Sequence, residues 1–344
     1  MTRVAINGFG RIGRTFFRMA YKNPDFEIVA INDLGDAENL AYLLTYDTAY
    51  GRSPYEVHAK KNAIVVNGKE IAFLSERDPA ALPWNDMNID VVVEATGVFA
   101  SYEKAKVHLT AGAKRVVISA PVKDDPAAAN VKGATVLVGV NDAALGKCDI
   151  SSNASCTTNA ASPLVAILKE AVGIEKAFLN TVHAYTSTQS PIDGPNKKDF
   201  RKGRSAAQNI IPTSTGAAIA TTKAHTDLEG KFDGIAMRVP VPVGSIVDVT
   251  FLASRATTVE EINDALREAA KSAKWSGIFA VTEEPIVSSD IIGAPYASIA
   301  DLAFTRVVDG DLVKVLAWYD NETGYTQTLV QHVAALSRFL STKS

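Results

Sequence analysis

The chain has very few cysteines, with only Cys148 and Cys156 among its 344 residues. Two cysteines cannot form the disulfide framework of a small secreted domain, which argues for a reducing compartment. No cluster of cysteine, histidine or acidic residues has the spacing of a metal site. We therefore expect a cytoplasmic protein without a bound metal.

Long apolar runs and an excess of basic residues are also missing. No apolar run is long enough to cross a bilayer, and the first residues lack the charged and apolar regions of a secretory signal. The formal net charge is -3, which does not indicate a dedicated nucleic-acid binder. The composition, 47% hydrophobic and 21% charged, is that of a globular protein, and the length allows two domains. We expect its partners to be small molecules and copies of itself.

A glycine-rich segment follows the first expected strand, residues 2–7, and precedes an expected helix, residues 14–21. Gly8, Gly10 and Gly13 complete the pattern G-x-G-x-x-G. In a strand–turn–helix setting the first glycine allows a tight turn, the second lets backbone approach a pyrophosphate, and the third lets the helix pack closely on the strand. The segment predicts a dinucleotide site at a helix N-terminus.

The acidic residue Asp33 supports this interpretation. It follows a second expected strand, residues 27–32, and lies twenty residues after Gly13. A carboxylate at this place can accept hydrogen bonds from both ribose hydroxyls and repels a 2′-phosphate. The sequence therefore predicts NAD rather than NADP as the cofactor.

The remaining patterns predict two domains of different class. In the first half, strands are expected at residues 89–95 and 115–121, with a helix at 102–113 between them. This alternation predicts an α/β fold, a Rossmann-type doubly wound parallel sheet. In the second half, expected strands at 176–189, 234–242, 245–253 and 312–319, with a helix at 259–273, predict an α+β domain with a mixed or antiparallel sheet. We place the domains at 1–154 and 155–320, with the first completed by a final helix in 321–344.

Cys156 lies between a strand-like run, residues 134–140, and an amphipathic pattern at 157–172. The unpaired N–H groups and the dipole of a helix N-terminus favour an anion there, and so favour thiolate over thiol. His183, in the next expected strand, is the best placed of the histidines to take the thiol proton. The two would form an imidazolium–thiolate pair.

Donors for an anionic substrate occur further along the chain. Thr215 and Gly216 offer a hydroxyl and backbone N–H groups, and Arg238 offers a guanidinium, which together suit a phosphate. Residues 187–203 have few apolar positions and read as a long functional loop. With a thiol, a base and a hydride acceptor, these donors predict an aldehyde-oxidising enzyme.

Seven motifs spread over the whole chain resemble the glyceraldehyde-3-phosphate dehydrogenase family. They are N-G-F-G-R-I-G-R at 7–14, I-N-D at 31–33, I-S-A-P at 118–121, S-C-T-T-N at 155–159, H-A-Y-T at 183–186, N-I-I-P at 209–212 with Thr215 and Gly216, and W-Y-D-N-E at 318–322. The resemblance implies oxidation of glyceraldehyde 3-phosphate with inorganic phosphate and NAD. The product would be 1,3-bisphosphoglycerate, formed through a thiohemiacetal and a thioester on Cys156.

The resemblance also implies roles for individual residues. His183 would activate Cys156. The cofactor would be held by Arg11, Ile12, Asp33, Arg77, Ser119 and Asn321. Substrate and phosphate would be held by Ser155, Thr157, Thr186, Thr215, Gly216 and Arg238. The family forms homotetramers in which the loop at 187–203 lies against a neighbour's cofactor site.

Three other functions compete with this one. Erythrose-4-phosphate dehydrogenase is a sister enzyme with the same nucleophile, and turnover of the two sugar phosphates distinguishes them. A cysteine hydrolase using Cys156 and His183 would not need the dinucleotide motif. A non-catalytic, NAD-dependent interaction protein would not need intact catalytic residues.

Overall fold

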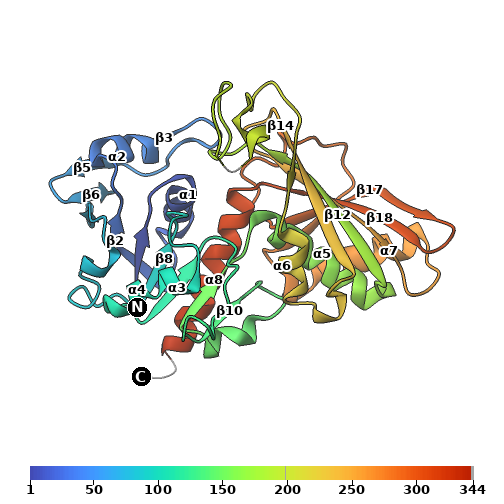
Figure 1. Cartoon of the computed structure of the whole chain (residues 1–344), viewed down its shortest axis with the longest axis horizontal. Coiled ribbons are helices and arrows are strands. Elements are labelled where there is room, and N and C mark those ends of the chain that lie inside the picture. The colour runs from blue at the N-terminus through green and yellow to red at the C-terminus, as the bar shows by residue number, and fades with distance from the viewer. Residues whose placement is uncertain (198, 342–344) are drawn as a thin grey trace. The chain divides into compact units, whose positions relative to one another are not determined.

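The computed structural model describes residues 1–197 and 199–341, which form two compact units (Figure 1). The first unit consists of Met1–Ala154 and the end of the chain from Thr328, and the second of Ser155–Gln327. Among the described residues, no helix is both long enough and apolar enough to cross a membrane.

The first unit is built on a nine-stranded sheet whose order is β10-β11-β9-β8-β1-β2-β7-β6-β5. Neighbouring strands are parallel except that β6 runs antiparallel to β5 and β7. The strands are β1 (Thr2–Asn7), β2 (Phe26–Asn32), β5 (Val57–Lys60), β6 (Ala63–Val66), β7 (Lys69–Leu74), β8 (Val91–Glu94), β9 (Arg115–Ile118), β10 (Gly133–Thr135) and β11 (Ile150–Ser152). A separate antiparallel pair is formed by β3 (Tyr46–Asp47) and β4 (Gly51–Arg52). The predicted doubly wound α/β fold is confirmed.

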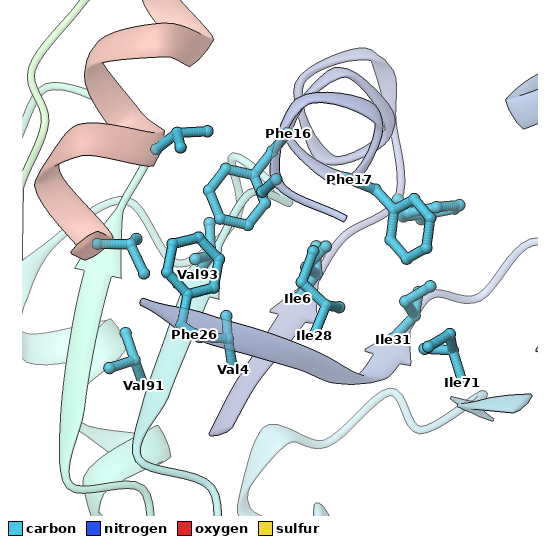
Figure 2. Packing of buried hydrophobic residues seen from close by; sticks show 14 of the residues in the cluster. Val4, Ile6, Phe16, Phe17, Phe26, Ile28, Ile31, Ile71, Val91 and Val93 are labelled. Atoms are coloured by element: carbon cyan, nitrogen blue, oxygen red, sulfur yellow. The ribbon is translucent and has the colours of Figure 1, made fainter. Parts of the chain in front are cut away.

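Helices pack an apolar layer against this sheet. They are α1 (Arg11–Ala20), α2 (Ala37–Thr45), α3 (Tyr102–Ala105), α4 (Val107–Thr110) and the later part of α8 (Thr323–Ser341). Figure 2 shows Phe16 reaching from α1 toward Phe26 and Phe17 toward Ile31 on the strands. The rings of Phe16 and Phe26 are stacked with centroids 6.0 Å apart. Central parallel strands are buried on both faces, which is why β8 is an unbroken run of apolar residues up to Glu94.

The final helix contributes to the same core. Leu329, Val330, Val333 and Leu336 belong to the buried cluster of the first unit. Phe339, which continues the apolar face in sequence, is 39% exposed. Leu340, in the last turn, is partly buried and packs on the same cluster, so the helix contacts this core along most of its length after Thr328.

The second unit contains a seven-stranded mixed sheet in the order β13-β14-β12-β15-β18-β17-β16. Its β12–β14 and β16–β17 pairs are parallel and the other pairs antiparallel. The strands are β12 (Lys176–Ala184), β13 (Ile211–Ser214), β14 (Phe232–Val239), β15 (Ser245–Leu252), β16 (Phe279–Thr282), β17 (Ser298–Val308) and β18 (Leu312–Tyr319). The helix α5 (Cys156–Val172) packs on β15, β17 and β18, with α6 (Ala217–Thr222) and α7 (Val259–Lys271) beside it. The predicted mixed sheet with helices is confirmed.

Several boundaries differ from the sequence prediction. Of residues 134–140 only the first two lie in a strand, β10, and the chain then turns through Gly139 with φ +80°. The strand that precedes Cys156 is instead β11, whose sequence Ile-Ser-Ser has no apolar pattern to reveal it. The predicted helix at 102–113 is two one-turn helices, α3 and α4. The strand predicted for 176–189 ends at Ala184.

The sequence prediction also missed whole elements. These are α2, α6, β3, β4, β5, β6, β7, β13, β16 and β17. Short 3₁₀ helices cover Pro79–Ala81, Asp142–Lys147, Phe200–Gly203, Thr226–Leu228 and Ala273–Trp275. Within 187–203, the described residues contain no helix or strand apart from the 3₁₀ turn at the end, as a long loop requires.

Candidate active site

Cys156 is the first residue of α5. Ser155 caps the helix with extended backbone (φ -105°, ψ 164°), and its Oγ accepts a hydrogen bond of 3.1 Å from the Thr158 N–H. Serine is a favoured N-cap because its hydroxyl satisfies one of the unpaired N–H groups of the first turn. The cap thereby places the thiol at the positive end of a 17-residue helix.

His183 meets Cys156 from β12, so the structure brings the two predicted catalytic residues together. The distance between Cys156 Sγ and His183 Nε2 is 3.2 Å. The histidine is 3% exposed, and its ring lies edge-on to Tyr319 with centroids 5.9 Å apart. The distance between Sγ and Nε2 is short enough for a hydrogen bond, and therefore for proton transfer between thiol and imidazole.

Arg238 contacts the other side of the same imidazole. In the parallel pairing of β12 with β14, His183 is the register partner of Arg238. The Nη1 atom of Arg238 lies 2.7 Å from His183 Nδ1 and 2.9 Å from the Ala184 carbonyl oxygen. That carbonyl is itself 2.7 Å from Nδ1. The guanidinium predicted to hold substrate therefore also touches the predicted base.

The electrostatics of the pair differ from the sequence expectation. Burial raises the pKa of the Cys156 thiol, and neither Arg238 nor the N–H groups at the start of α5 reverse this. The pKa of His183 is lowered to about 3, mainly by burial and to a smaller extent by the positive charge of Arg238. Removing a group from water disfavours its charged form. The N–H groups of the helix terminus do lower the pKa of the thiol, as expected, but burial outweighs them and favours the neutral thiol.

Tyr319 is a residue that the sequence reasoning did not single out. Its hydroxyl joins Thr157 Oγ1 at 2.9 Å and Thr181 Oγ1 at 2.7 Å. Burial raises the pKa of this phenol, so it stays protonated beside His183. The only signal in the sequence was its place in the W-Y-D-N-E motif at 318–322.

The predicted substrate-binding residues fall into separate groups. Ser155 Oγ lies 2.7 Å from Thr158 Oγ1, and Thr157 is bound to Tyr319. Thr186, just after β12, pairs with Thr188 at 2.9 Å between hydroxyl oxygens, and Thr188 was missed in the sequence. Thr215 and Gly216 precede α6, where the Thr215 hydroxyl accepts from the Ala217 N–H at 3.2 Å.

The glycine motif in the first unit has the geometry predicted for it. Gly8 has φ +97°, and a Cβ there would lie 2.6 Å from the Thr96 nitrogen. A Cβ on Gly13 would lie 2.1 Å from the Gly8 carbonyl oxygen, so only glycine lets α1 pack this closely on the turn. A Cβ on Gly10 would meet nothing within 4 Å, so this turn leaves open space beside the backbone.

A cavity of about 450 Å³ lies next to this turn. Asp33 is in its wall, held by hydrogen bonds from the Phe9 N–H (2.6 Å) and the Gly35 N–H (2.8 Å). The lining consists of Asn7, Gly8, Gly10, Asn32, Asp33, Leu34, Glu76, Arg77, Pro79, Ala95, Thr96, Val98 and Phe99. A glycine turn at a helix N-terminus with a fixed carboxylate nearby fits a dinucleotide.

Other predicted cofactor residues lie outside this lining. The Arg11 guanidinium binds Asp47, with Nη1 2.8 Å from Oδ2, and Ile12 packs on the apolar core. The Ser119 N–H donates to the Glu94 carbonyl at 2.9 Å. In the second unit, Asn321 Oδ1 accepts from the Gly244 N–H and the Ser245 hydroxyl. Among the residues that the structure describes, no group of three or more His, Cys, Asp and Glu could hold a metal ion.

A Rossmann-type unit joined to a second unit with a cysteine–histidine pair is the arrangement of an NAD-dependent oxidoreductase. Comparison with known proteins makes this specific. Residues 2–102 match the NAD binding domain of glyceraldehyde 3-phosphate dehydrogenase, and residues 155–321 match the C-terminal domain of the same enzyme. The chain therefore belongs to the glyceraldehyde-3-phosphate dehydrogenase family, as its motifs indicated.

Individual relatives are similar over nearly their whole length. The chain is 48% identical to a glyceraldehyde-3-phosphate dehydrogenase of Clostridium acetobutylicum over 343 residues, covering 98% of this chain and 99% of the relative. It is 49% identical to that of Clostridium pasteurianum, covering 96% and 97%. It is 48% identical to that of Geobacillus stearothermophilus, covering 97% and 98%. The predicted cofactor, NAD, is confirmed by the family.

Proposed function

We propose that this chain oxidises glyceraldehyde 3-phosphate in glycolysis, with Cys156 as nucleophile and His183 as base. The observation that carries the proposal is the 3.2 Å contact between Sγ and Nε2 at the start of α5. The names of the relatives favour this substrate over erythrose 4-phosphate. Family membership and the glycine turn likewise favour a dehydrogenase over a cysteine hydrolase, and the paired catalytic groups favour an enzyme over an interaction protein.

The reaction begins with transfer of the thiol proton. When the His183 Nδ1–H donates to the Ala184 carbonyl, the lone pair of Nε2 faces Sγ and can accept this proton. Sγ then forms a bond to the aldehyde carbon, and the carbonyl oxygen takes up the negative charge. Protonated Nε2 and the Cys156 backbone N–H stabilise that oxygen, and Nε2 then passes its proton to it, which gives a thiohemiacetal and leaves His183 neutral.

Oxidation and phosphorolysis complete the cycle. His183 removes the hydroxyl proton of the thiohemiacetal as the aldehyde hydrogen leaves as hydride. NAD, when bound, supplies the hydride acceptor. The thioester on Cys156 is attacked at its carbonyl carbon by inorganic phosphate, and the C–S bond breaks. The sulfur takes back the proton held by His183, and 1,3-bisphosphoglycerate is released.

Arg238 helps His183 to serve as both base and acid. A guanidinium only donates hydrogen bonds, so when Arg238 donates to Nδ1 the ring proton must be on Nε2, facing the sulfur. When Nδ1 instead donates to the Ala184 carbonyl, Nε2 is a base. The cationic group beside the ring also explains part of the lowered pKa of His183. This lets the ring release a proton readily after it has accepted one.

The anionic groups of the reaction would be held by hydroxyls and backbone N–H groups. Thr186 and its neighbour Thr188, Thr215 with Gly216, and Arg238 provide donors of this kind. Ser155 and Thr157 begin α5, and their side chains are engaged with Thr158 and Tyr319. We expect these two to act through backbone N–H groups.

NAD would lie at the glycine turn of the first unit. Gly8, Gly10 and Gly13 allow close approach of phosphates to the N-terminus of α1, and Asp33 would accept the ribose hydroxyls. Arg77 lies in the same wall. Arg11, Ile12, Ser119 and Asn321 remain assigned on the resemblance alone.

The assembly and the division into domains complete the proposal. We infer a cytoplasmic homotetramer in which residues 187–203 lie against a neighbour's cofactor site. The NAD-binding domain would be 1–154 with the helical end of the chain, and the catalytic domain 155–320.

The test is formation of NADH from glyceraldehyde 3-phosphate, measured with and without inorganic phosphate. We expect rapid turnover only with phosphate, and much slower turnover of erythrose 4-phosphate. Faster turnover of erythrose 4-phosphate would contradict the substrate, and turnover without phosphate would contradict the acyl acceptor.

A further inference from the structure

Behind the proposed NAD cavity lies a buried network that the reaction does not use. Its centre is Glu94, the last residue of β8, which is 2% exposed. His108 from α4 is fully buried, and its Nε2 lies 3.1 Å from Glu94 Oε2. A carboxylate so deeply buried is costly unless donors surround it.

The orientation of His108 is fixed by a third residue. The indole N–H of Trp84 lies 3.1 Å from His108 Nδ1. An indole can only donate, so Nδ1 accepts this hydrogen bond and the ring proton is on Nε2, directed at Glu94. Trp84 is itself completely buried, which leaves the imidazole little freedom to turn.

The remaining donors to Glu94 come from the wall of the cavity. Asn7 Nδ2 donates to Oε2 at 2.6 Å, and the Thr96 N–H donates to Oε1 at 2.8 Å. The Thr96 hydroxyl also donates to Oε1, and its oxygen accepts from the Val98 N–H at 3.0 Å. Asn7, Thr96 and Val98 all line the cavity.

The same network reaches the glycine turn and the second strand. Asn7 Oδ1 accepts from Asn32 Nδ2 at 2.7 Å, and Asn32 precedes Asp33. A Cβ on Gly8 would strike the Thr96 nitrogen at 2.6 Å, so the two turns are in direct contact. Glu94 therefore fixes one wall of the cavity through Asn7 and Thr96, which both line it. Thr96 and Val98 are exposed, so buried packing does not hold this turn in place.

We propose that Glu94 and His108 form a buried positioning pair that holds Asn7 and the turn at 96–98 in the conformation that binds NAD. The inference rests on the proposed function, because it takes this cavity as the cofactor site. Ordering the wall in advance lowers the entropy cost of binding. The pair touches no reacting atom, so it acts on cofactor affinity and not on the chemistry at Cys156.

Two substitutions break the network in different ways. In Glu94→Gln one carboxylate oxygen becomes an NH₂ group, which donates and cannot accept. It must then face either the donors of Asn7 and His108 or those of Thr96. In His108→Leu both the acceptor for Trp84 and the donor to Glu94 are lost. We expect the dissociation constant of NAD to rise at least about tenfold in each variant. The kcat at saturating NAD and the alkylation rate of Cys156 without NAD should remain near the wild-type values.

Two further variants separate positioning from general destabilisation. His108→Gln restores an acceptor for Trp84 and a donor for Glu94, and should bind NAD nearly as the wild type does. His332→Leu removes another fully buried histidine of the same unit, whose partners Ser151 and Asn153 do not line the cavity. It should lower the unfolding temperature without weakening NAD binding.

The experiment is titration of each purified full-length protein with NAD, with thermal unfolding recorded in parallel. Wild-type affinity in a folded His108→Leu protein would overturn the proposal, as would equal weakening in His332→Leu. If Glu94→Gln does not fold, the comparison of His108→Leu with His108→Gln decides. Failure of the wild type itself to bind NAD would instead contradict the proposed function.

Discussion

Each unit buries a histidine near the end of a strand, but the two imidazole rings have different surroundings. His108 lies against Glu94 at the end of β8, and His183 is itself close to the end of β12. His108 has an indole N–H on one side and a carboxylate on the other, so both ring nitrogens are engaged with fixed partners. His183 faces a thiol on one side, and on the other it has a guanidinium and a carbonyl that favour opposite tautomers. Burial alone therefore does not make a histidine reactive. A reactive ring needs a partner that can exchange a proton and a second side that tolerates both tautomers.

The two cysteines differ in the same way. Burial raises the pKa of both thiols. Cys148 Sγ contacts the Ala144 carbonyl oxygen at 3.0 Å, an acceptor that cannot remove the proton. Cys156 faces His183 at the start of a helix. We expect the second to be the nucleophile, because His183 is a base within reach of its proton.

The largest effect on activity should come from exchanging the Cys156 thiol for a hydroxyl. Cys156→Ser should abolish NADH formation, because the poorer nucleophile cannot form the thioester, while NAD binding is retained. Cys148→Ser is the matched control and should keep most of the activity. Steady-state assay and NAD titration of both proteins test this. Substantial activity in Cys156→Ser would rule out the assigned nucleophile.

Replacing the base should have the next largest effect. His183→Asn should lower kcat by roughly 10²–10⁴-fold, the usual contribution of a positioned acid–base group. It should also raise the pH at which iodoacetamide alkylates Cys156, because the thiol loses the base that accepts its proton. His332→Leu, another buried histidine, is the control and should keep the alkylation profile. An unchanged profile in His183→Asn would show that the pair does not act as a unit.

Replacing Asp33 should have a smaller effect, on the preference for NAD over NADP. Its carboxylate is fixed by two backbone N–H groups in the cavity wall, where it would repel a 2′-phosphate. Such repulsion can cost several kcal/mol, on the order of a hundredfold in preference. Asp33→Ala should therefore narrow the ratio of kcat/KM between NAD and NADP. Equal use of both cofactors by the wild type would contradict the role of Asp33.

The smallest effect concerns acid stability. Burial lowers the pKa of His332 to about 3, whereas an unfolded histidine titrates near its ordinary value of about 6.5. As the pH falls from about 6.5 toward 3, the unfolded state binds a proton that the folded state excludes, so stability falls through this window. His183 contributes in the same direction.

Urea unfolding at about pH 7.5 and about pH 5 tests this linkage. His332→Leu should be less stable than the wild type at the higher pH, because its contacts with Ser151 and Asn153 are lost. Its further loss of stability on acidification should be smaller than that of the wild type. An equal loss in both proteins would show that His332 does not contribute to acid sensitivity.

Much of the fold follows from local patterns that the sequence displays. The turn at Gly8, the strand before it and the helix from Cys156 depend on glycine sterics, β-branched runs and a serine cap, all of which act over a few residues. The elements that were missed lack such signals. β11 has the sequence Ile-Ser-Ser, and the helix predicted at 102–113 is broken into two single turns.

By itself, then, the sequence determined the two classes of domain, the glycine turn with Asp33, and the presence of a thiol at a helix start with a histidine in the following strand. Only the tertiary structure decided what these groups touch. The register of β12 with β14 puts Arg238 beside His183, and Tyr319 reaches Thr157 from a strand far away in the chain. Burial, which also depends on the whole fold, raises the pKa of the thiol and lowers that of the imidazole. Local patterns do not encode these contacts, because strand order and register depend on how the whole core packs.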